Sequence, residues 1–285
     1  MIENPELQDH GSELSELEAT QPIVDNDFKD DEDNDGSIIA GPTVGAHVHL
    51  AKTASMCFLI IIITNTHTTA ASCIHPNDLA AGIGQHDLIF LIKKFLYSQT
   101  HPQSQGQVPE ASLPSFDDKI TIYPSAVATF YSPSDISGGG GMRNERIRAI
   151  KSWRKGPPRH DCIFVETDPD ASGMAGLDIA RVCLFFSCKF DGVKYPCALV
   201  HWFSRVGQSA DPGTGMWIVE PDLTDDGVPI TSVIHLDTVI RAAHLLPVFK
   251  DKYVSQDLSF NDTLNEFKSF YVNKFVDHHA FEIAF

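Results

Sequence analysis

The sequence predicts an α+β fold in which mainly antiparallel strands form a small barrel or sandwich with flanking helices. Between positions 116 and 250, short runs of alternating apolar and polar residues have the period of two that is typical of half-buried strands. Turn-forming residues recur about every ten positions there, a spacing typical of small barrels and sandwiches. The clearest local signal is Asp191-Gly192, which separates two such runs and favours a two-residue hairpin turn.

Composition divides the chain into five segments. Residues 1–41 form an acidic tail, with 13 acidic residues and one lysine before position 37, and are expected to be disordered. Residues 42–100 combine an apolar extended segment with a helix, and residues 101–115 form a linker rich in Pro, Gln and Ser. Residues 116–250 are the β-rich domain, and residues 251–285 are expected to hold a C-terminal helix and tail.

The elements follow from local patterns in chain order. A first helix is predicted from Asn77 to about Ser98, because apolar residues in its second half recur at helical spacing and Asp87 suits an N-terminus. A second, amphipathic helix is predicted from about Phe260 to Phe275. The strands expected between the helices are the runs KITIYPSAVATFYS (two strands broken at the proline), CIFVET, DIARVCLFFSCKF, KYPCALVHWFSR, GMWIVEP, TSVIHL and AAHLLPVF.

The apolar run from Met56 to Thr64 does not predict a membrane span. It is about ten residues long with its flank, whereas a membrane-spanning helix needs about 20. Its consecutive isoleucines are β-branched and favour a buried strand. No membrane partner is therefore expected.

The sequence contains no recognised catalytic or metal-binding spacing. The six cysteines form no CxxC pair, and no GxSxG nucleophile motif occurs. The glycine run at 138–141 lacks the lysine and hydroxyl residue of a phosphate-binding loop. The carboxylates around the strand at 162–167 lack the alternating strand and helix pattern of a ribonuclease-H-like fold. The chain is therefore expected to be no enzyme and to use no cofactor, metal or small-molecule substrate.

A basic stretch between Met142 and His160 is the first candidate binding site. It has seven cationic residues and one acid, Glu145, in an otherwise acidic chain. Clustered cations neutralise phosphates, and an aromatic ring among them can stack on a base. The candidate nucleic-acid-binding residues are Arg143, Arg146, Arg148, Lys151, Trp153, Arg154, Lys155 and Arg159. The alternative is a solvated basic surface that pairs with the acidic tail or with another acidic segment.

Three aromatic residues on predicted strands, Trp202, Phe203 and Trp217, are the second candidate site. Aromatic rings can surround a methylated lysine through cation–π attraction. Neighbouring residues of a strand point to opposite faces, so only one of Trp202 and Phe203 is expected to line a given pocket. The alternative is that all three belong to the core.

Nine segments of the chain carry a resemblance to a known family: FLYSQTHP, ATFYSPSD, GGMRNERIRA, RHDCIFVETD, LDIARVCLFFSCKF, YPCALVHWFSRVG, GMWIVEPD, SVIHLDTVIRAAHLLPVF and YVNKFVDHHAFEIAF. They resemble the C-terminal region of transposase-like proteins encoded by the CACTA-related, Plavaka-type elements of mushroom-forming fungi. The resemblance covers the chain from about Gly45 or His86 to Phe285.

This resemblance implies an intracellular, nuclear, transposon-derived protein. Catalysis in that family belongs to a ribonuclease-H-like domain upstream of the region that matches, and no catalytic residue is carried over. The resemblance therefore implies a non-catalytic accessory domain that contacts DNA or a transposase partner.

A second likeness concerns the order of the strands between Leu177 and Phe249. The run ALVHWFSR, a later strand and HLDTVI together are similar to bromo-adjacent-homology (BAH) domains, which are β-rich chromatin readers. This likeness implies a chromatin or protein-interaction module in which Trp202, Phe203 and Trp217 contact the ligand.

Overall fold

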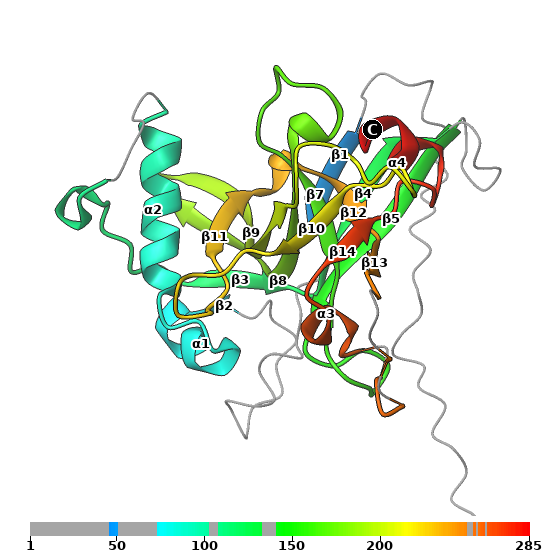
Figure 1. Ribbon diagram of the computed structural model, residues 1–285. Coiled ribbons are helices and arrows are strands. Elements are labelled where there is room, and N and C mark those ends of the chain that lie inside the picture. The colour runs from blue at the N-terminus through cyan, green and yellow to red at the C-terminus, as the bar shows by residue number, and fades with distance from the viewer. Residues whose placement is uncertain are drawn as a thin grey trace, which may run out of the picture. The chain divides into compact units, whose positions relative to one another are not determined.

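The computed structural model describes residues 46–50, 73–102, 108–132, 141–249, 253–254, 256–259 and 261–285 (Figure 1). All of them belong to one compact unit, Ile39–Phe285. The fold is α+β, with mostly antiparallel strands that form a curled half-barrel and with few helices, in agreement with the predicted class. The predicted disordered tail at 1–41 and the apolar run at 56–64 lie outside the described residues.

A long hairpin made of β8 (Leu177–Phe190) and β9 (Val193–Arg205) forms the centre of the fold. Its turn is Asp191-Gly192, with φ values of 48° and 80°. Both residues of a type I′ turn need this left-handed region, which glycine adopts freely and aspartate tolerates. The predicted hairpin is confirmed.

The partners of the hairpin change along its length. The first half of β8 pairs with β7 and the second half with β3, while β9 pairs first with β11 and then with β10. A β-bulge between Val182 and Leu184 marks the change in β8, and bulges of this kind increase the local twist of a strand. The sheet therefore curls. The other strands of this sheet are β2 (Cys73–Ile74), β3 (Ile120–Tyr123), β7 (Cys162–Glu166), β10 (Ile218–Pro221), β11 (Thr231–His235), β12 (Val239–Ala243), β13 (Leu245–Pro247) and β14 (Phe270–Val272).

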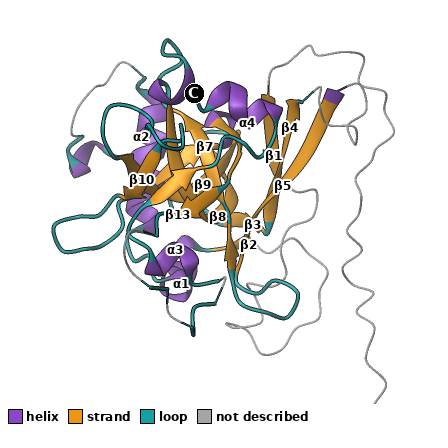
Figure 2. Cartoon of the chain, turned by 45° about the vertical axis from the view of Figure 1, so that its right-hand side comes forward, coloured by secondary structure: helices purple, strands orange, loops and turns teal. Residues whose placement is uncertain are grey.

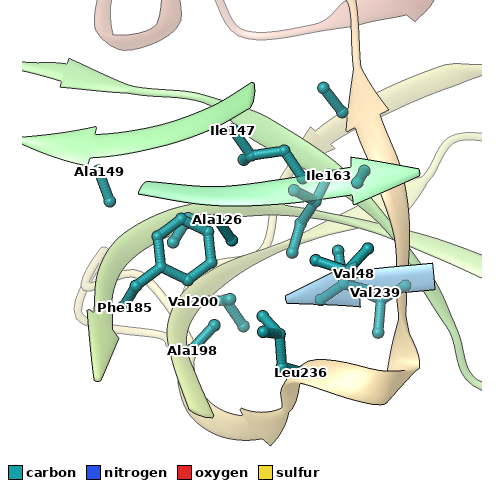
Figure 3. Close-up of a cluster of buried hydrophobic side chains, with 14 of the residues drawn as sticks. Val48, Ala126, Ile147, Ala149, Ile163, Phe185, Ala198, Val200, Leu236 and Val239 are labelled. Atoms are coloured by element: carbon teal, nitrogen blue, oxygen red, sulfur yellow. The ribbon is translucent and has the colours of Figure 1, made fainter. Parts of the chain in front are cut away.

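A smaller sheet has the strand order β1-β4-β5-β6, and its first three strands lie side by side in Figures 1 and 2. Its strands are β1 (Ala46–Leu50), β4 (Ser125–Tyr131), β5 (Met142–Ile150) and β6 (Arg159–His160). Alternate residues of this sheet pack against the larger sheet in one apolar core (Figure 3). From the smaller sheet come Val48, Ala126, Ile147 and Ala149, and from the larger sheet and its connections Ile163, Phe185, Ala198, Val200, Leu236 and Val239.

Each run predicted as a strand between 116 and 250 contains a strand, with AAHLLPVF spanning the end of β12 and all of β13, but β5 and the short β6 were not predicted. β5 occupies the first part of the basic stretch. The sequence predicted no strand in this stretch, which follows a glycine-rich loop. Arg146 and Arg148 alternate on it with the buried Ile147 and Ala149, so the period of two was present but hidden by the charges. Short 3₁₀ turns complete the connections: Glu110–Ser112, Gly173–Ala175 and Leu236–Thr238.

The helix predicted from Asn77 to Ser98 is two helices, α1 (Pro76–Ile83) and α2 (Leu88–Thr100). Gly84 ends α1 in the left-handed conformation, with φ of 70°, and its N–H bonds back to the carbonyls of the last turn. Asp87 holds the N-cap position of α2, as predicted, without a capping side-chain bond. The apolar stripe of α2 is buried against β3, β8, β9 and β11, and α2 lies beside β11 in Figure 1.

The helix predicted from Phe260 to Phe275 is wrong. The chain there forms the single turn α3 (Thr263–Glu266), the strand β14, and then α4 (His278–Ile283). Phe270 and Val272 alternate into the core and pair with β10 and β13, so sheet pairing outweighs the helical pattern of the sequence. In the described part of the chain no helix has the length and apolarity to cross a membrane.

Candidate nucleic-acid interface

The predicted basic residues divide between β5, the turn that follows it and β6. On β5, Arg146 and Arg148 lie on the face opposite the core, and Arg146 donates a hydrogen bond to Ser125. Arg143 lies on the inner side, where its guanidinium is 3.6 Å from the carboxylate of Asp277. The structure therefore separates Arg143 from the other candidates, because it belongs to a buried charge network near the C-terminus.

Trp153 gathers three arginines, and we call these four residues the arginine cluster. The guanidinium carbons of Arg154, Arg159 and Arg148 lie 4.5, 4.8 and 5.7 Å from the centroid of its ring. Cation–π attraction offsets part of the repulsion between these like charges. Trp153 was predicted to stack on a base, but in this structure guanidinium groups lie over its ring.

The tip of the turn has an uncommon backbone conformation. Arg154 and Lys155 have positive φ values of 51° and 59°. Side chains other than glycine rarely adopt this region, which costs about 1 kcal/mol or more for each residue, and such strain is often found at functional positions. Both side chains are exposed, so the strained tip presents two cations to solvent.

Asp161 fixes the arginine cluster to both sheets. One carboxylate oxygen accepts a hydrogen bond from Arg159 Nε at 2.8 Å, and the other accepts one from the backbone N–H of Arg148 at 2.8 Å. The Asp161 N–H donates to the carbonyl of Arg148, and its carbonyl accepts from Val182 of β8. Asp161 therefore positions the arginine cluster through both its carboxylate and its backbone.

Lys151 joins the turn to α1. Its ammonium group donates a hydrogen bond to the carbonyl of Gly82 near the end of the helix, where carbonyls lack helical partners. Burial lowers the pKa of Lys151 from its ordinary value. Lys151 therefore contributes both charge and an anchor between the turn and the helix.

Two neighbouring hollows open beside the arginine cluster, and both are bordered by Pro158, His160 and Arg181. The tryptophan hollow, of about 560 Å³, is further lined by Trp153, Arg154, Gly156, Pro157, Arg159, Asp161, Asn261 and Leu264. The histidine hollow, of about 570 Å³, is further lined by Gly82, Ile83, Gln85, Lys151, Cys183, Leu199 and His201. The three shared residues therefore form a common wall of the two hollows.

Arg181 supplies charge to both hollows. It lies opposite His201 in the β8–β9 register, and its guanidinium donates a hydrogen bond of 2.7 Å to the amide oxygen of Asn265. Burial, with Arg181 nearby, lowers the pKa of His160 and His201, so both imidazoles are neutral at pH 7. His160 Nδ1 donates to the carbonyl of Val182, which leaves Nε2 as an acceptor.

Sequence reasoning missed Arg181, His160 and His201 as site residues. Arg181 and His201 each interrupt an apolar run, IARVCLFF and ALVHWF, and a charged or titratable residue in such a run was the available signal. The pairing of the two across the hairpin follows from the turn at Asp191-Gly192. His160 joins them only through the fold of the smaller sheet.

The second candidate site lies elsewhere, at the end of β9. Phe203 is buried and packs edge-to-face on Phe270, while Trp202 packs on the core at the other side of the sheet. Trp217 packs on the same core as Phe203, and its indole N–H donates to the carbonyl of Phe285 at 3.3 Å. Phe203 is therefore a core residue, as the alternative interpretation of the sequence expected, whereas Trp202 and Trp217 are only partly buried.

A hollow of about 510 Å³ borders all three aromatic residues, together with Asp178, Asp222 and Arg205. The expectation that only one of Trp202 and Phe203 can line a pocket is wrong, because this hollow lies at the end of the strand and borders consecutive residues. Arg205 Nε is 3.9 Å from the Asp178 carboxylate, and Arg205 Nη1 donates to the carbonyl of Met174 at 2.6 Å. The hollow therefore combines two carboxylates with one guanidinium.

The histidine hollow is lined by one cysteine, Cys183. Burial raises the pKa of the Cys183 thiol to about 12, so it is neutral at pH 7 and a poor nucleophile despite the neighbouring imidazoles. Within the residues that the structure describes, no three side chains of His, Cys, Asp or Glu are grouped to hold a metal ion. Comparison of the chain with family models, with curated proteins and with solved structures found no match.

Proposed function

We propose that this chain is a non-catalytic nucleic-acid-binding domain that holds phosphate groups at the arginine cluster. The observation that carries the proposal is the gathering of three guanidinium groups around Trp153, with the carboxylate of Asp161 holding Arg159 in place. Guanidinium groups match phosphate geometry and bind it through paired hydrogen bonds. A chain with a net charge of −17 has a local surface of the opposite sign, which supports a polyanionic partner.

The resemblance to the C-terminal region of Plavaka-type transposase-like proteins supports DNA as that polyanion. In this proposal the domain works in the nucleus as an accessory part of a transposon-derived protein, beside DNA or a transposase partner. The arginine cluster supplies sequence-independent affinity, because phosphate contacts position a protein on nucleic acid without reading bases.

The proposal predicts that binding to DNA weakens when one exposed guanidinium is removed. In Arg154→Ala, the affinity for a labelled DNA is expected to fall about fivefold at low salt, and the slope of log K against log salt by about one. Fluorescence anisotropy across a salt series measures both. The control is Lys189→Ala, which removes an exposed cation near the tip of the β8–β9 hairpin. Equal losses in the two variants, or salt-independent binding, contradict the proposal.

A chromatin or protein-interaction module of BAH-like type is the second candidate function. The observation in its favour is the hollow at the end of β9, where Trp202 and Trp217 meet the carboxylates of Asp178 and Asp222. Aromatic rings and carboxylates together suit a cationic ligand such as a methylated lysine. Selective binding of methylated histone peptides by the wild type, and its loss in Trp202→Ala, supports this candidate, whereas equal binding of unmethylated peptides contradicts it.

A further inference from the structure

We propose that the two hollows beside the arginine cluster accept unpaired bases, and that the nucleic acid bound here is single-stranded. One base enters the tryptophan hollow, its neighbour enters the histidine hollow, and a phosphate lies on Arg181 between them. This inference rests on the proposed nucleic-acid-binding function and names the form of nucleic acid that the surface selects.

The size and placement of the hollows carry the first step. They measure about 560 and 570 Å³ and share Pro158, His160 and Arg181 as a common wall. Volumes of about 300–1,000 Å³ are typical of sites for small organic ligands, so each hollow has room for one base. Two such hollows side by side match consecutive nucleotides of one strand.

The walls of the histidine hollow have the chemistry that a base requires. Ile83 and Leu199 provide apolar surface, and His160 and His201 provide aromatic rings that are neutral at pH 7. Imidazole rings stack on unpaired bases, and the edges of those bases need hydrogen-bond partners. Gln85 offers a donor and an acceptor in the same hollow, and His160 Nε2 is a further acceptor.

Arg181 has the charge for a phosphate between the hollows. Its hydrogen-bond partner is the neutral amide of Asn265, and no carboxylate of the described chain lies within ion-pairing distance of its guanidinium. Its neighbour Arg159, in contrast, is paired with Asp161 at 2.8 Å. The positive charge on the shared wall is therefore available to an incoming phosphate.

The concave form of the surface argues against a duplex. In a double helix the bases are stacked and paired, and they reach a protein pocket only when they leave the stack, at a cost of a few kcal/mol for each base. A strand without a partner does not have this cost. A duplex can still touch the arginine cluster through its phosphates, which makes the two forms of nucleic acid distinguishable by affinity.

The test compares one labelled oligonucleotide as a single strand and as its blunt duplex, by fluorescence anisotropy at the same salt concentration with the full chain. The single strand is expected to bind at least ~10-fold more tightly, because stacking contributes about 1–3 kcal/mol for each base. Equal affinities, with both lowered in Arg154→Ala, overturn this inference and leave the proposed function standing. Absence of binding to either form overturns both.

Two variants locate the selectivity. Cys183→Leu fills part of the histidine hollow without a change of charge and is expected to lower the affinity for the single strand about fivefold, with the duplex unaffected. Its control is Cys73→Leu, at an exposed cysteine of β2 outside the residues that line the hollows. An unchanged preference in a folded Cys183→Leu overturns the inference.

The second variant, Arg181→Gln, keeps a hydrogen-bonding side chain for Asn265 and removes the shared charge. It decides the question if Cys183→Leu does not fold, as judged by thermal unfolding. It is expected to reduce the preference for the single strand about fivefold, whereas Lys189→Gln leaves the preference unchanged. A full preference in Arg181→Gln overturns the inference.

Discussion

Trp153 shows how one residue can organise a charged surface. Three guanidinium groups lie within 6 Å of its ring centroid, and like charges at such separations repel each other. The ring offsets this repulsion through cation–π attraction, and Asp161 offsets more of it through the hydrogen bond to Arg159. The sequence showed the cations, but it did not show that the tryptophan is their common contact.

Arg241 is the opposite case, a cation with no exposed surface. Its guanidinium makes two hydrogen bonds to Asp277, at 2.6 and 2.8 Å, and one of 3.2 Å to Glu145. It also lies over the ring of Phe130 at 4.1 Å, which in turn stacks on His279. This network joins β5, β12 and the start of α4, and it also holds Arg143, one of the predicted nucleic-acid-binding residues.

We predict that Arg241→Met destabilises the fold by about 3–5 kcal/mol, because it removes the buried cation that the carboxylates of Glu145 and Asp277 share. Urea unfolding followed by fluorescence measures the change. Adding Glu145→Gln to this variant is expected to restore part of the loss, since one uncompensated charge is removed. The comparison is Arg205→Met, whose ion pair with Asp178 is partly exposed and is worth at most about 1 kcal/mol. A similar cost for both single variants contradicts the prediction.

At the scale of elements, patterns within a short stretch of chain were predicted correctly. The β8–β9 hairpin follows from Asp191-Gly192 and the alternating runs beside it, all within one continuous stretch. The helix predicted in the C-terminal region was wrong because Phe270 and Val272 pair with β10 and β13, which are distant in sequence. Local periodicity does not contain that information, since the same apolar residues can fit a short helix or an edge strand.

Gly84 separates α1 from α2, and we predict that Gly84→Ala destabilises the fold by about 1 kcal/mol. A Cβ there meets no atom within 4 Å, so the cost comes from the left-handed φ of 70° alone. Gly82→Ala, two residues earlier in the exposed helical turn, is expected to be neutral or stabilising by up to about 1 kcal/mol. Urea unfolding of both variants gives the comparison, and a stabilising Gly84→Ala contradicts this account of the helix end.

At the scale of the whole molecule, the candidate site depends on contacts between distant segments. Arg181 and His201 are joined by the central hairpin, His160 comes from β6, and Lys151 reaches the carbonyl of Gly82. The basic residues between 143 and 159 could be identified in the sequence because they are close together in the chain, whereas Arg181 could not. The hollows could not, because their walls come from α1, the turn after β5, and the two central strands.

The buried titratable groups predict how the stability of the whole fold depends on pH. Burial lowers the pKa of His160, His201 and His279, which also have Arg181 or Arg241 nearby, so the unfolded chain takes up protons first as the pH falls. The contribution of these neutral histidines to the free energy of unfolding is therefore fully present above the ordinary histidine pKa of about 6.5. It is lost as the pH falls from there toward their lower pKa values in the folded protein.

The buried carboxylates continue the same trend at lower pH. Burial alone would raise the pKa of Glu145 and Asp277, but hydrogen bonds and the charge of Arg241, with His244 at Glu145, outweigh it and hold both values below their ordinary range. The contribution of these carboxylates to the free energy of unfolding is present above their pKa of about 4 in the unfolded chain. It is lost as the pH falls through their lower pKa values in the folded protein.

We therefore expect the free energy of unfolding to decrease in two stages, one beginning near pH 6.5 and one near pH 4, when urea unfolding is repeated between pH 8 and pH 3. His279→Phe tests the first stage, because phenylalanine can keep the stacking on Phe130 and removes a buried imidazole whose Nδ1 has no hydrogen-bond partner in the described structure. This variant is expected to lose less stability between pH 7.5 and pH 5.5 than the wild type. An unchanged pH profile would show that His279 is not among the groups that take up protons on unfolding.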